Sequence, residues 1–367
     1  MRRPTSHPQD SRYSYRRSYV IGWTIIATLV FVDALWLRTG AYSVRLASLI
    51  ATAKPNMTLL AVAAALGAMT RITRYRSAIR TLRYAELSQT LAYVAMLSCF
   101  ASTCSILSYL CVTTNAPLID DDLIQFDRLL GFDWSSTYQW VRAHPDIHRA
   151  LALAYDSGLW QLIGIPVLLG LMGRRRQLAE FSLLFMSAAV LTSLVPAIVP
   201  AASAFTHFGI TDPQTASTVS DFALLRSGSL RTFDLSAAQG LVSMPSFHTE
   251  MAVIFAYALR RVPVVSVIGV ALNAVMIAST PTEGGHYLAD VIGGLLLALA
   301  LIGVARSMRR RRIPQLAAVT AASSPSETGE PVARRFGFAS TNERSAYPAG
   351  PFTAEAPPCG TCAGNDP

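Results

Sequence analysis

The sequence predicts an all-α, polytopic integral membrane protein, and two observations carry this prediction. The chain has 367 residues, of which 52% are hydrophobic and only 14% are charged, whereas soluble domains average about 25% charged residues. Apolar runs of roughly 17–25 residues, the length that crosses a bilayer, recur along the chain. We therefore expect a helix bundle that has lipid as its solvent.

Eight apolar segments are candidates for membrane spans. A cleaved signal peptide is the alternative for the first, but this run is longer than a usual signal core and no clear small-residue cleavage site follows it. The second and sixth segments look short for a full crossing. The eight segments cover residues 19–37, 55–70, 86–112, 151–172, 178–199, 247–259, 264–280 and 286–306.

The placement of the basic residues orients the bundle and argues against nucleic acid as a partner. The formal net charge is +9, and the arginines cluster between apolar segments, where the positive-inside rule puts them. We expect the N-terminus inside and a multi-pass protein of the inner or plasma membrane. The basic residues left on the outer side are then Arg38, Arg45, Lys54, Arg128, Arg142, Arg149, Arg226 and Arg231.

A long outer loop at 113–150 contains a helical pattern of its own. Leu118, Leu123, Phe126 and Leu130 fall near helical spacing among several aspartates. This pattern predicts an amphipathic helix that lies on the membrane surface.

Ionisable residues are costly in a membrane, so those at the expected helix ends are candidates for function. His248 is the first of them. Pro245 and Ser246 are typical of a helix start, because proline suits the first turn and serine caps free N–H groups. His248 is therefore expected in the first turn of the span at 247–259, at the outer surface.

A second histidine precedes the last span. Gly284 and Gly285 break the chain, and His286 and Asp290 follow, four residues apart on one helix face. Asp290 is then placed to accept a hydrogen bond from one imidazole nitrogen. That bond fixes the tautomer and leaves the other nitrogen as a nucleophile.

His248, His286 and Asp290 together suit phosphoryl transfer at the outer face. Helix N-termini favour an anion, a nucleophilic His286 attacks phosphorus, and an acidic His248 protonates the leaving oxygen. No metal or cofactor is needed for these steps.

Three other interpretations stay open on the residues alone. The histidines could be polar anchors at the membrane interface. The chain could be a non-catalytic transporter or scaffold, although transporters usually place ionisable residues near the midplane. A metal could be held by His286 and Asp290 with a further ligand from His248, His207, Glu250 or Glu283.

Two stretches resemble a known family. Pro245-Ser246-Phe247-His248 and Gly285-His286-Tyr287-Leu288-Ala289-Asp290 resemble the second and third motifs of the type-2 phosphatidic acid phosphatase superfamily. The branch resembled is the bacterial inositol phosphorylceramide synthase-like (inositolphosphotransferase) one. Residues 126–134 and 154–157 also resemble it, so the similarity covers roughly 115–305.

The resemblance implies a six-helix core that acts on lipid phosphates through a covalent phosphohistidine. It implies that His286 is the nucleophile, Asp290 its orienting carboxylate and His248 the general acid. Ser246 corresponds to a phosphate-contacting position, and Gly285 is expected beside the substrate.

The sequence departs from the wider superfamily at two phosphate-binding positions. The first motif needs a lysine followed seven residues later by an Arg-Pro pair, but Ala61 follows Lys54. The third motif opens with Ser-Arg, whereas Ser279 and Thr280 stand here. The branch resembled is similar in lacking the first motif. Further candidates for substrate binding are Arg226, Arg231, Arg128 and, as an orienting residue, Asp156.

We therefore expect an enzyme that transfers or hydrolyses a phosphoryl or phospho-alcohol group of a lipid phosphate. Water as acceptor gives a phosphatase and an alcohol gives a transferase, and the same residues serve both. The expected parts are a basic cytoplasmic tail at 1–18, N-terminal spans at 19–112, a catalytic membrane domain at 113–306 and a disordered cytoplasmic tail at 307–367.

Overall fold

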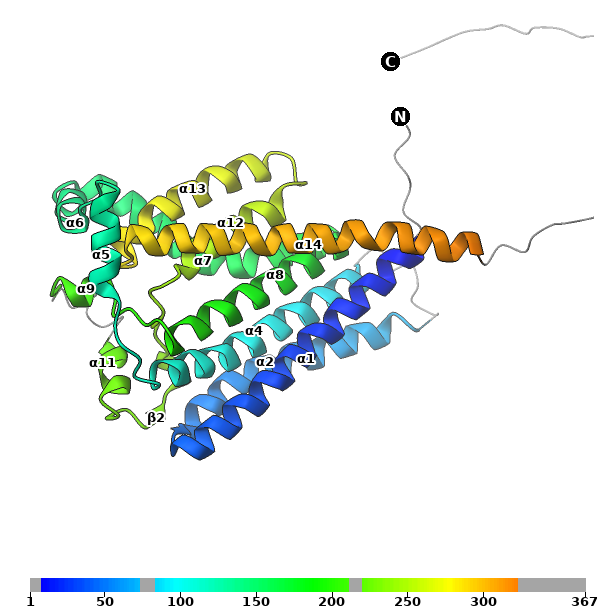
Figure 1. The fold of residues 1–367 in the computed structure, drawn as a ribbon. Coiled ribbons are helices and arrows are strands. Elements are labelled where there is room, and N and C mark those ends of the chain that lie inside the picture. Colours follow the sequence, from blue (N-terminus) through cyan, green and yellow to red (C-terminus); the bar gives the residue numbers. More distant parts are fainter. Residues whose placement is uncertain (1–7, 73–82, 211–219, 323–367) are drawn as a thin grey trace, which may run out of the picture. The chain divides into compact units, whose positions relative to one another are not determined.

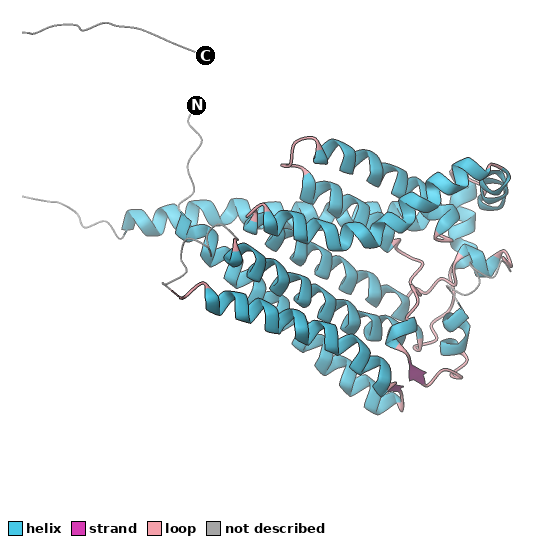
Figure 2. Cartoon of the chain, turned by 180° about the vertical axis from the view of Figure 1, so that it is seen from behind, coloured by secondary structure: helices cyan, strands magenta, loops and turns pink. Residues whose placement is uncertain are grey.

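The computed structural model describes residues 8–72, 83–210 and 220–322, and in these ranges the chain is almost entirely helical (Figures 1 and 2). The described residues up to Pro314 form one compact unit. The elements in chain order are α1 (Pro8–Gly40), β1 (Ser43–Val44), α2 (Leu46–Met69), α4 (Tyr84–Val112), α5 (Asp120–Leu129), α6 (Trp134–Ala143), α7 (Pro145–Leu171), α8 (Arg175–Leu194), η2 (Val195–Ala197), α9 (Ala204–His207), α11 (Ser220–Arg226), β2 (Thr232–Phe233), η3 (Leu235–Ala237), α12 (Phe247–Leu259), α13 (Val265–Glu283) and α14 (Leu288–Ala322).

The all-α, polytopic membrane fold is confirmed. Within the described ranges, seven helices are long and apolar enough to cross a membrane: α1, α2, α4, α7, α8, α13 and α14. The helix α12 is apolar but has only 13 residues. Each of the eight expected spans coincides with one of these helices, and the sixth is the short one.

Three helices are longer than the apolar pattern predicts. The helix α1 begins at Pro8 and α2 begins at Leu46, with Pro55 inside it. The helix α14 continues to Ala322, so its last turns fall in the tail that we expected to be disordered; residues 323–367 lie outside the described residues. An apolar run marks the part of a helix that lies in lipid. The backbone hydrogen bonds of the helix can continue beyond it into polar sequence.

The long helices run side by side between two ends of the bundle (Figure 1). The starts of α12 and α14, with His248 and His286, lie at one end together with α5, α6, α9 and α11. We call this the histidine end. The turn from α7 to α8 and the turn from α12 to α13 lie at the other end. Arg174–Arg176, Arg260 and Arg261 are found there, and we call it the arginine end.

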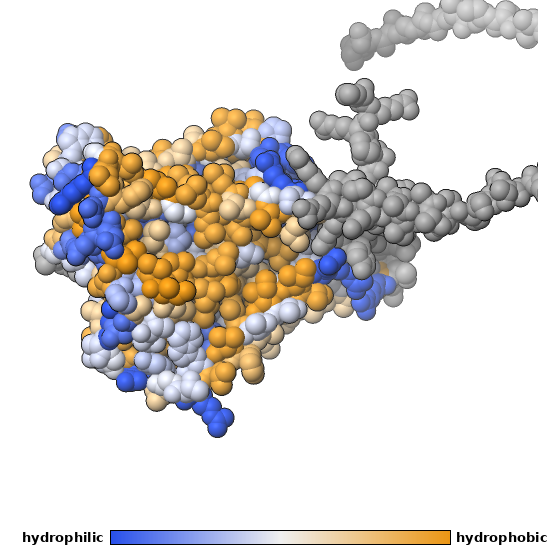
Figure 3. Space-filling model, in the orientation of Figure 1, coloured by the Kyte–Doolittle hydropathy of each residue, from blue (hydrophilic) through white to orange (hydrophobic). Residues whose placement is uncertain are grey.

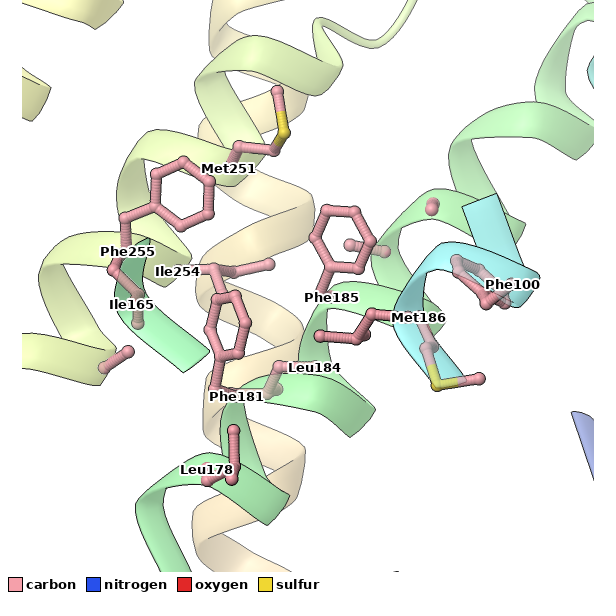
Figure 4. Packing of buried hydrophobic residues seen from close by; sticks show 14 of the residues in the cluster. Phe100, Ile165, Leu178, Phe181, Leu184, Phe185, Met186, Met251, Ile254 and Phe255 are labelled. Atoms are coloured by element: carbon pink, nitrogen blue, oxygen red, sulfur yellow. The ribbon is translucent and has the colours of Figure 1, made fainter. Parts of the chain in front are cut away.

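The core lies where α4, α7, α8 and α12 meet. Figure 4 shows Phe181 and Phe185 of α8 with Met251, Ile254 and Phe255 of α12, all of them buried. The outer surface keeps many large apolar side chains exposed, and the middle of the face in Figure 3 is mostly apolar. Because lipid is as apolar as these side chains, close packing and hydrogen bonds hold the helices together.

A small parallel ladder joins the α1–α2 turn to the loop before α12. The strands β1 and β2 pair in parallel. Arg231, next to β2, donates a hydrogen bond to the Gly40 carbonyl at 3.1 Å, and its guanidinium lies 5.0 Å from the ring centroid of Tyr42. The N-terminal helices are thereby anchored to the long loop that precedes His248.

The segment at 113–150 forms α5 and α6, and α5 differs from the surface helix that we expected. Of the four apolar residues that suggested it, only Leu123 is buried. Asp120 and Asp127 lie on the same helix face as Leu123 and are buried with it. A helix lying on the membrane surface would turn its acidic residues to water, but these two carboxylates accept hydrogen bonds inside the molecule.

Candidate active site

Helix capping holds His248 at the start of α12. Ser246 is the N-cap residue, and its Oγ accepts a hydrogen bond from the Thr249 N–H at 3.4 Å. The Ser246 N–H donates to the Asp290 carbonyl oxygen at 2.9 Å. The helix start predicted from Pro245 and Ser246 is therefore present, and it ties α12 to the first turn of α14.

The loop before α14 brings His286 against Asp290, which lies in the first turn of that helix. The expectation that both residues share one helix face was wrong, because α14 begins at Leu288, but the expected contact is present. His286 Nδ1 lies 3.4 Å from Asp290 Oδ2, and the same oxygen accepts hydrogen bonds from Ser243 Oγ at 2.8 Å and from the Tyr287 N–H at 2.9 Å. His286 is 5% exposed and Asp290 is fully buried. An ionised carboxylate only accepts hydrogen bonds, so this contact holds the His286 proton on Nδ1 and leaves a lone pair on Nε2.

His248 contacts Tyr155 of α7 in two ways. The Tyr155 hydroxyl lies 3.1 Å from His248 Nδ1. The two rings also stack, with centroids 4.0 Å apart and an interplanar angle of 21°. Gly158, one turn further along α7, lets Met276 of α13 pack beside this pair, since a Cβ there would lie 2.9 Å from Met276 Cε.

Gly285 turns the chain between α13 and α14. Its φ is +65°, a region that favours glycine. A Cβ here would clash with the ring of Phe205 and would lie 2.6 Å from Ser203 Oγ. The Gly285 carbonyl oxygen accepts hydrogen bonds from the Ala204 N–H at 2.9 Å and from Ser203 Oγ at 2.8 Å. Glycine at this position therefore lets the loop before α9 approach the backbone beside His286.

Two buried carboxylates of α5 hold the same segment from another side. Asp127 accepts hydrogen bonds from the Leu288 N–H at 2.7 Å and the Ala289 N–H at 2.8 Å, so it caps the first turn of α14. Asp120 accepts a hydrogen bond from the Tyr287 hydroxyl at 2.8 Å. Burial raises the pKa of both carboxyls above their ordinary values, and the backbone hydrogen bonds that they accept act in the opposite direction.

Both histidines line one cavity of about 350 Å³. Its walls come from α4, α7, α8, α11, α12 and the loops before α9, α12 and α14, and they combine hydroxyl and amide groups with apolar side chains. Ala101 of α4 and Leu159 of α7 line the cavity and are also exposed on the outer surface of the bundle. The cavity is thus bordered by lipid-facing residues between these two helices.

The other predicted substrate-binding residues lie outside this lining. Arg128 and Asp156 are exposed on α5 and α7. Arg231 donates a hydrogen bond to the Gly40 carbonyl at the α1–α2 turn. Arg226 is the one placed against the cavity wall: its guanidinium lies 5.8 Å from the ring centroid of Phe222, which lines the cavity. Its Nη1 is buried and has no hydrogen-bond partner among the described residues.

No group of three His, Cys, Asp or Glu side chains in the described parts of the chain is arranged to hold a metal ion. The residues considered as further ligands have other partners. Glu250 accepts a hydrogen bond from Thr192 at 2.6 Å, and Glu283 lies 3.3 Å from His148.

Sequence reasoning missed four residues that shape the site: Tyr155, Ser243, Asp120 and Asp127. For the two aspartates a signal existed, because positions 120, 123 and 127 share one helix face, which marks an inward-facing polar side of α5. Ser243 and Tyr155 stand in stretches that the sequence singles out, but their contacts depend on how distant helices pack.

The helical bundle is that of a polytopic membrane protein. A family model described as the PAP2 superfamily matches residues 121–304, half of the chain. The chain belongs to the PAP2 superfamily, whose members are phosphatases or phosphotransferases. No curated protein and no solved structure matches the chain.

Proposed function

We propose that this chain moves a phosphoryl or phospho-alcohol group of a lipid phosphate through a phosphohistidine at His286. One observation carries the proposal: His286 and His248 line the same cavity, and each has its Nδ1 engaged, by Asp290 and by Tyr155 respectively. Each imidazole therefore keeps its Nε2 for chemistry. Membership of the PAP2 superfamily supports the reaction class.

In the first step the Nε2 lone pair of His286 attacks phosphorus. A P–N bond forms while the P–O bond to the leaving alcohol breaks, and the leaving oxygen takes a proton from His248 Nε2. Asp290 stabilises the positive charge that develops on the phosphorylated imidazole. In this scheme His248 begins the first step protonated on both ring nitrogens, so that Nδ1–H donates a hydrogen bond to the Tyr155 hydroxyl oxygen and Nε2–H is the proton that is transferred.

In the second step an acceptor oxygen attacks the phosphorus of the phosphohistidine. His248 takes the acceptor's proton, the P–N bond breaks, and both histidines return to their starting states. Water as the acceptor makes the enzyme a phosphatase. An alcohol makes it a transferase. A transferred phosphoryl group then gives a phosphomonoester, and a transferred phospho-alcohol group gives a new phosphodiester, as the resemblance to the inositol phosphorylceramide synthase-like branch suggests.

The border of the cavity supports a lipid as substrate. Because Ala101 and Leu159 line the cavity and are also exposed on the outer surface of the bundle, an acyl chain lies between α4 and α7 while its phosphate reaches the histidines. Arg226 supplies positive charge at the wall formed by Phe222, and the start of α12 offers backbone N–H groups.

We place the site on the outer face of the inner or plasma membrane. The arginine end carries clusters that the positive-inside rule assigns to the cytoplasm, and the histidines lie at the other end. A membrane-impermeant thiol reagent added to intact cells should label Ser236→Cys and not Arg261→Cys, with the unsubstituted chain as the blank. The reverse pattern would place the histidines inside the cell.

Product analysis tests the proposed reaction. The purified full chain is given phosphatidic acid alone and then with candidate alcohols, and the products are identified. Phosphate release marks a phosphatase, and transfer of the phosphate to the alcohol, as a new phosphomonoester, marks a transferase. Either product should be absent with His286→Ala. A folded wild-type chain that yields neither product, or a His286→Ala chain that yields as much as wild type, contradicts the proposal.

A further inference from the structure

The arginine end carries a charge cluster that lies apart from the catalytic cavity. At its centre Glu180 of α8 accepts hydrogen bonds from Arg260 at 2.8 Å, from Arg309 of α14 at 2.7 Å and from the Tyr257 hydroxyl at 2.8 Å. Arg260 also lies over the Tyr257 ring, 3.6 Å from its centroid. One carboxylate therefore joins α8, α12 and α14, and its charge is already shared by two guanidinium groups.

More positive charge surrounds this centre than the nearby carboxylates balance. Arg176 is exposed and lies within electrostatic range of Arg260, Arg261 and Arg309. Arg261 and Arg306 are exposed as well, and in the described part of the chain none of Arg176, Arg261 and Arg306 has a carboxylate within ion-pair distance.

The neighbouring arginines do not relieve this surplus. Arg174 donates hydrogen bonds to the Arg261 carbonyl at 2.7 Å and to Gln177 Oε1 at 3.1 Å, both of them neutral acceptors. Arg175 has a carboxylate of Glu86 at 4.0 Å, the limit of an ion pair. The cluster therefore has guanidinium groups that an external anion can bind.

The surroundings indicate where that anion comes from. The cluster lies at the ends of α8, α12 and α14, where a lipid headgroup meets a membrane helix. Val264 and Val267, at the start of α13, are more than 70% exposed, and Val304 and Met308 of α14 are more than half exposed. Apolar side chains exposed beside the surplus arginines fit an acyl chain, which a free anion lacks.

We propose that the arginine end binds the phosphate of an anionic phospholipid among Arg176, Arg261 and Arg306. The guanidinium groups bind the phosphate oxygens, as planar donors suit them, and the exposed apolar residues of α13 and α14 contact the acyl chains. This lipid is bound for structure and is not turned over, since the histidines lie at the opposite end of the bundle. The proposal does not depend on the reaction proposed above.

The test compares lipid binding by matched variants of the full chain. Arg176→Gln/Arg261→Gln removes two charges from the cluster, and Arg38→Gln/Arg149→Gln removes two exposed charges elsewhere. Retention of phosphatidylglycerol is measured by native mass spectrometry across a lipid titration. Since each basic residue at an anionic surface contributes about fivefold to binding, the first variant should bind roughly 30-fold more weakly and the second should match wild type.

A second arm separates a lipid from a free anion. Phosphatidylglycerol should raise the unfolding temperature of the wild-type chain in zwitterionic detergent, and inorganic phosphate at the same concentration should not. The cluster variant should lose this stabilisation and the control variant should keep it. Equal retention of lipid by both variants, or equal stabilisation by inorganic phosphate, overturns the proposal.

Discussion

Tyr155 and His248 are joined both by a hydrogen bond, with the hydroxyl 3.1 Å from Nδ1, and by stacked rings whose centroids lie 4.0 Å apart. Stacking fixes the plane of the imidazole, and the hydroxyl selects its tautomer. Asp290 likewise contacts Nδ1 of His286 and so selects the tautomer of that imidazole. The proposed mechanism gives the two histidines different roles, one in contact with a tyrosine and the other with an aspartate.

Tyr155→Phe tests the first of these contacts, because it keeps the ring and removes the hydroxyl. We expect the single-turnover release of the leaving alcohol from a lipid phosphate to slow about tenfold or more, as general acid catalysis contributes about 10²–10⁴-fold. With p-nitrophenyl phosphate, whose leaving group needs no proton, the loss should be much smaller. Tyr42→Phe is the control. Equal losses on both substrates would mean that Tyr155 only supports the fold.

Gly285→Ala tests the turn that presents His286. The substitution adds a Cβ that would clash with Phe205 at a residue with positive φ. Gly131→Ala is a matched control, because Gly131 has a φ of +76° but open space around its Cβ position. Backbone strain alone costs about 1–2 kcal/mol. Unfolding temperatures should therefore fall further for Gly285→Ala, and its activity should be lost; similar behaviour of the two variants would contradict this account.

Arg226→Gln tests the source of positive charge for the phosphate. A charge-assisted hydrogen bond contributes about 1.5–3 kcal/mol, so kcat/KM should fall roughly 10- to 100-fold for a lipid phosphate. Arg128→Gln, which removes an exposed arginine of α5, should leave kcat/KM unchanged. Steady-state kinetics in mixed micelles measures both. If Arg128→Gln has the larger effect, the phosphate is held elsewhere.

Asp127→Asn tests the buried cap of α14 through its pH dependence. Burial raises the native pKa of Asp127 above its unfolded value of about 3.9. The native state therefore holds this proton more tightly, and the contribution to the free energy of unfolding is largest below the unfolded pKa and declines as pH rises through the native pKa.

Asparagine at position 127 does not ionise, so the stability advantage of wild type over Asp127→Asn should shrink between about pH 4 and pH 7. Unfolding temperatures of both proteins in detergent at the two pH values measure this difference. An advantage that grows with pH would show that the two backbone N–H donors outweigh burial and lower the native pKa.

Features that depend on neighbouring residues were predictable from the sequence. The apolar runs predicted the spanning helices, Ser246 predicted the start of α12, and four-residue spacing predicted the contact of His286 with Asp290. The first two follow from the geometry of a single helix or from the solvent around it. The third is a contact between residues close in sequence, although His286 lies in the loop before α14. The short α12 was also foreseen, because its apolar run has only 13 residues.

Contacts between distant segments were not predictable in the same way. Tyr155 and His248 are 93 residues apart in the chain, and Asp127 and Leu288 are 161 residues apart. Arg231 and Arg226 looked equivalent as loop cations, but packing engages one at the α1–α2 turn and places the other against the cavity wall. Such partners depend on how the helices pack against one another, and a local sequence pattern does not predict that packing.

The central claim is a covalent phosphohistidine at His286, and trapping that intermediate tests it most directly. His248→Ala lacks both the acid for the first step and the base for the second, so the intermediate should accumulate with p-nitrophenyl phosphate, whose leaving group needs no proton. After a quench at alkaline pH and proteolysis, mass spectrometry should find the transferred group on the peptide with His286, and it should be absent in the His248→Ala/His286→Ala variant. A group found on another residue, or product formed by His286→Ala at the wild-type rate, would contradict the account.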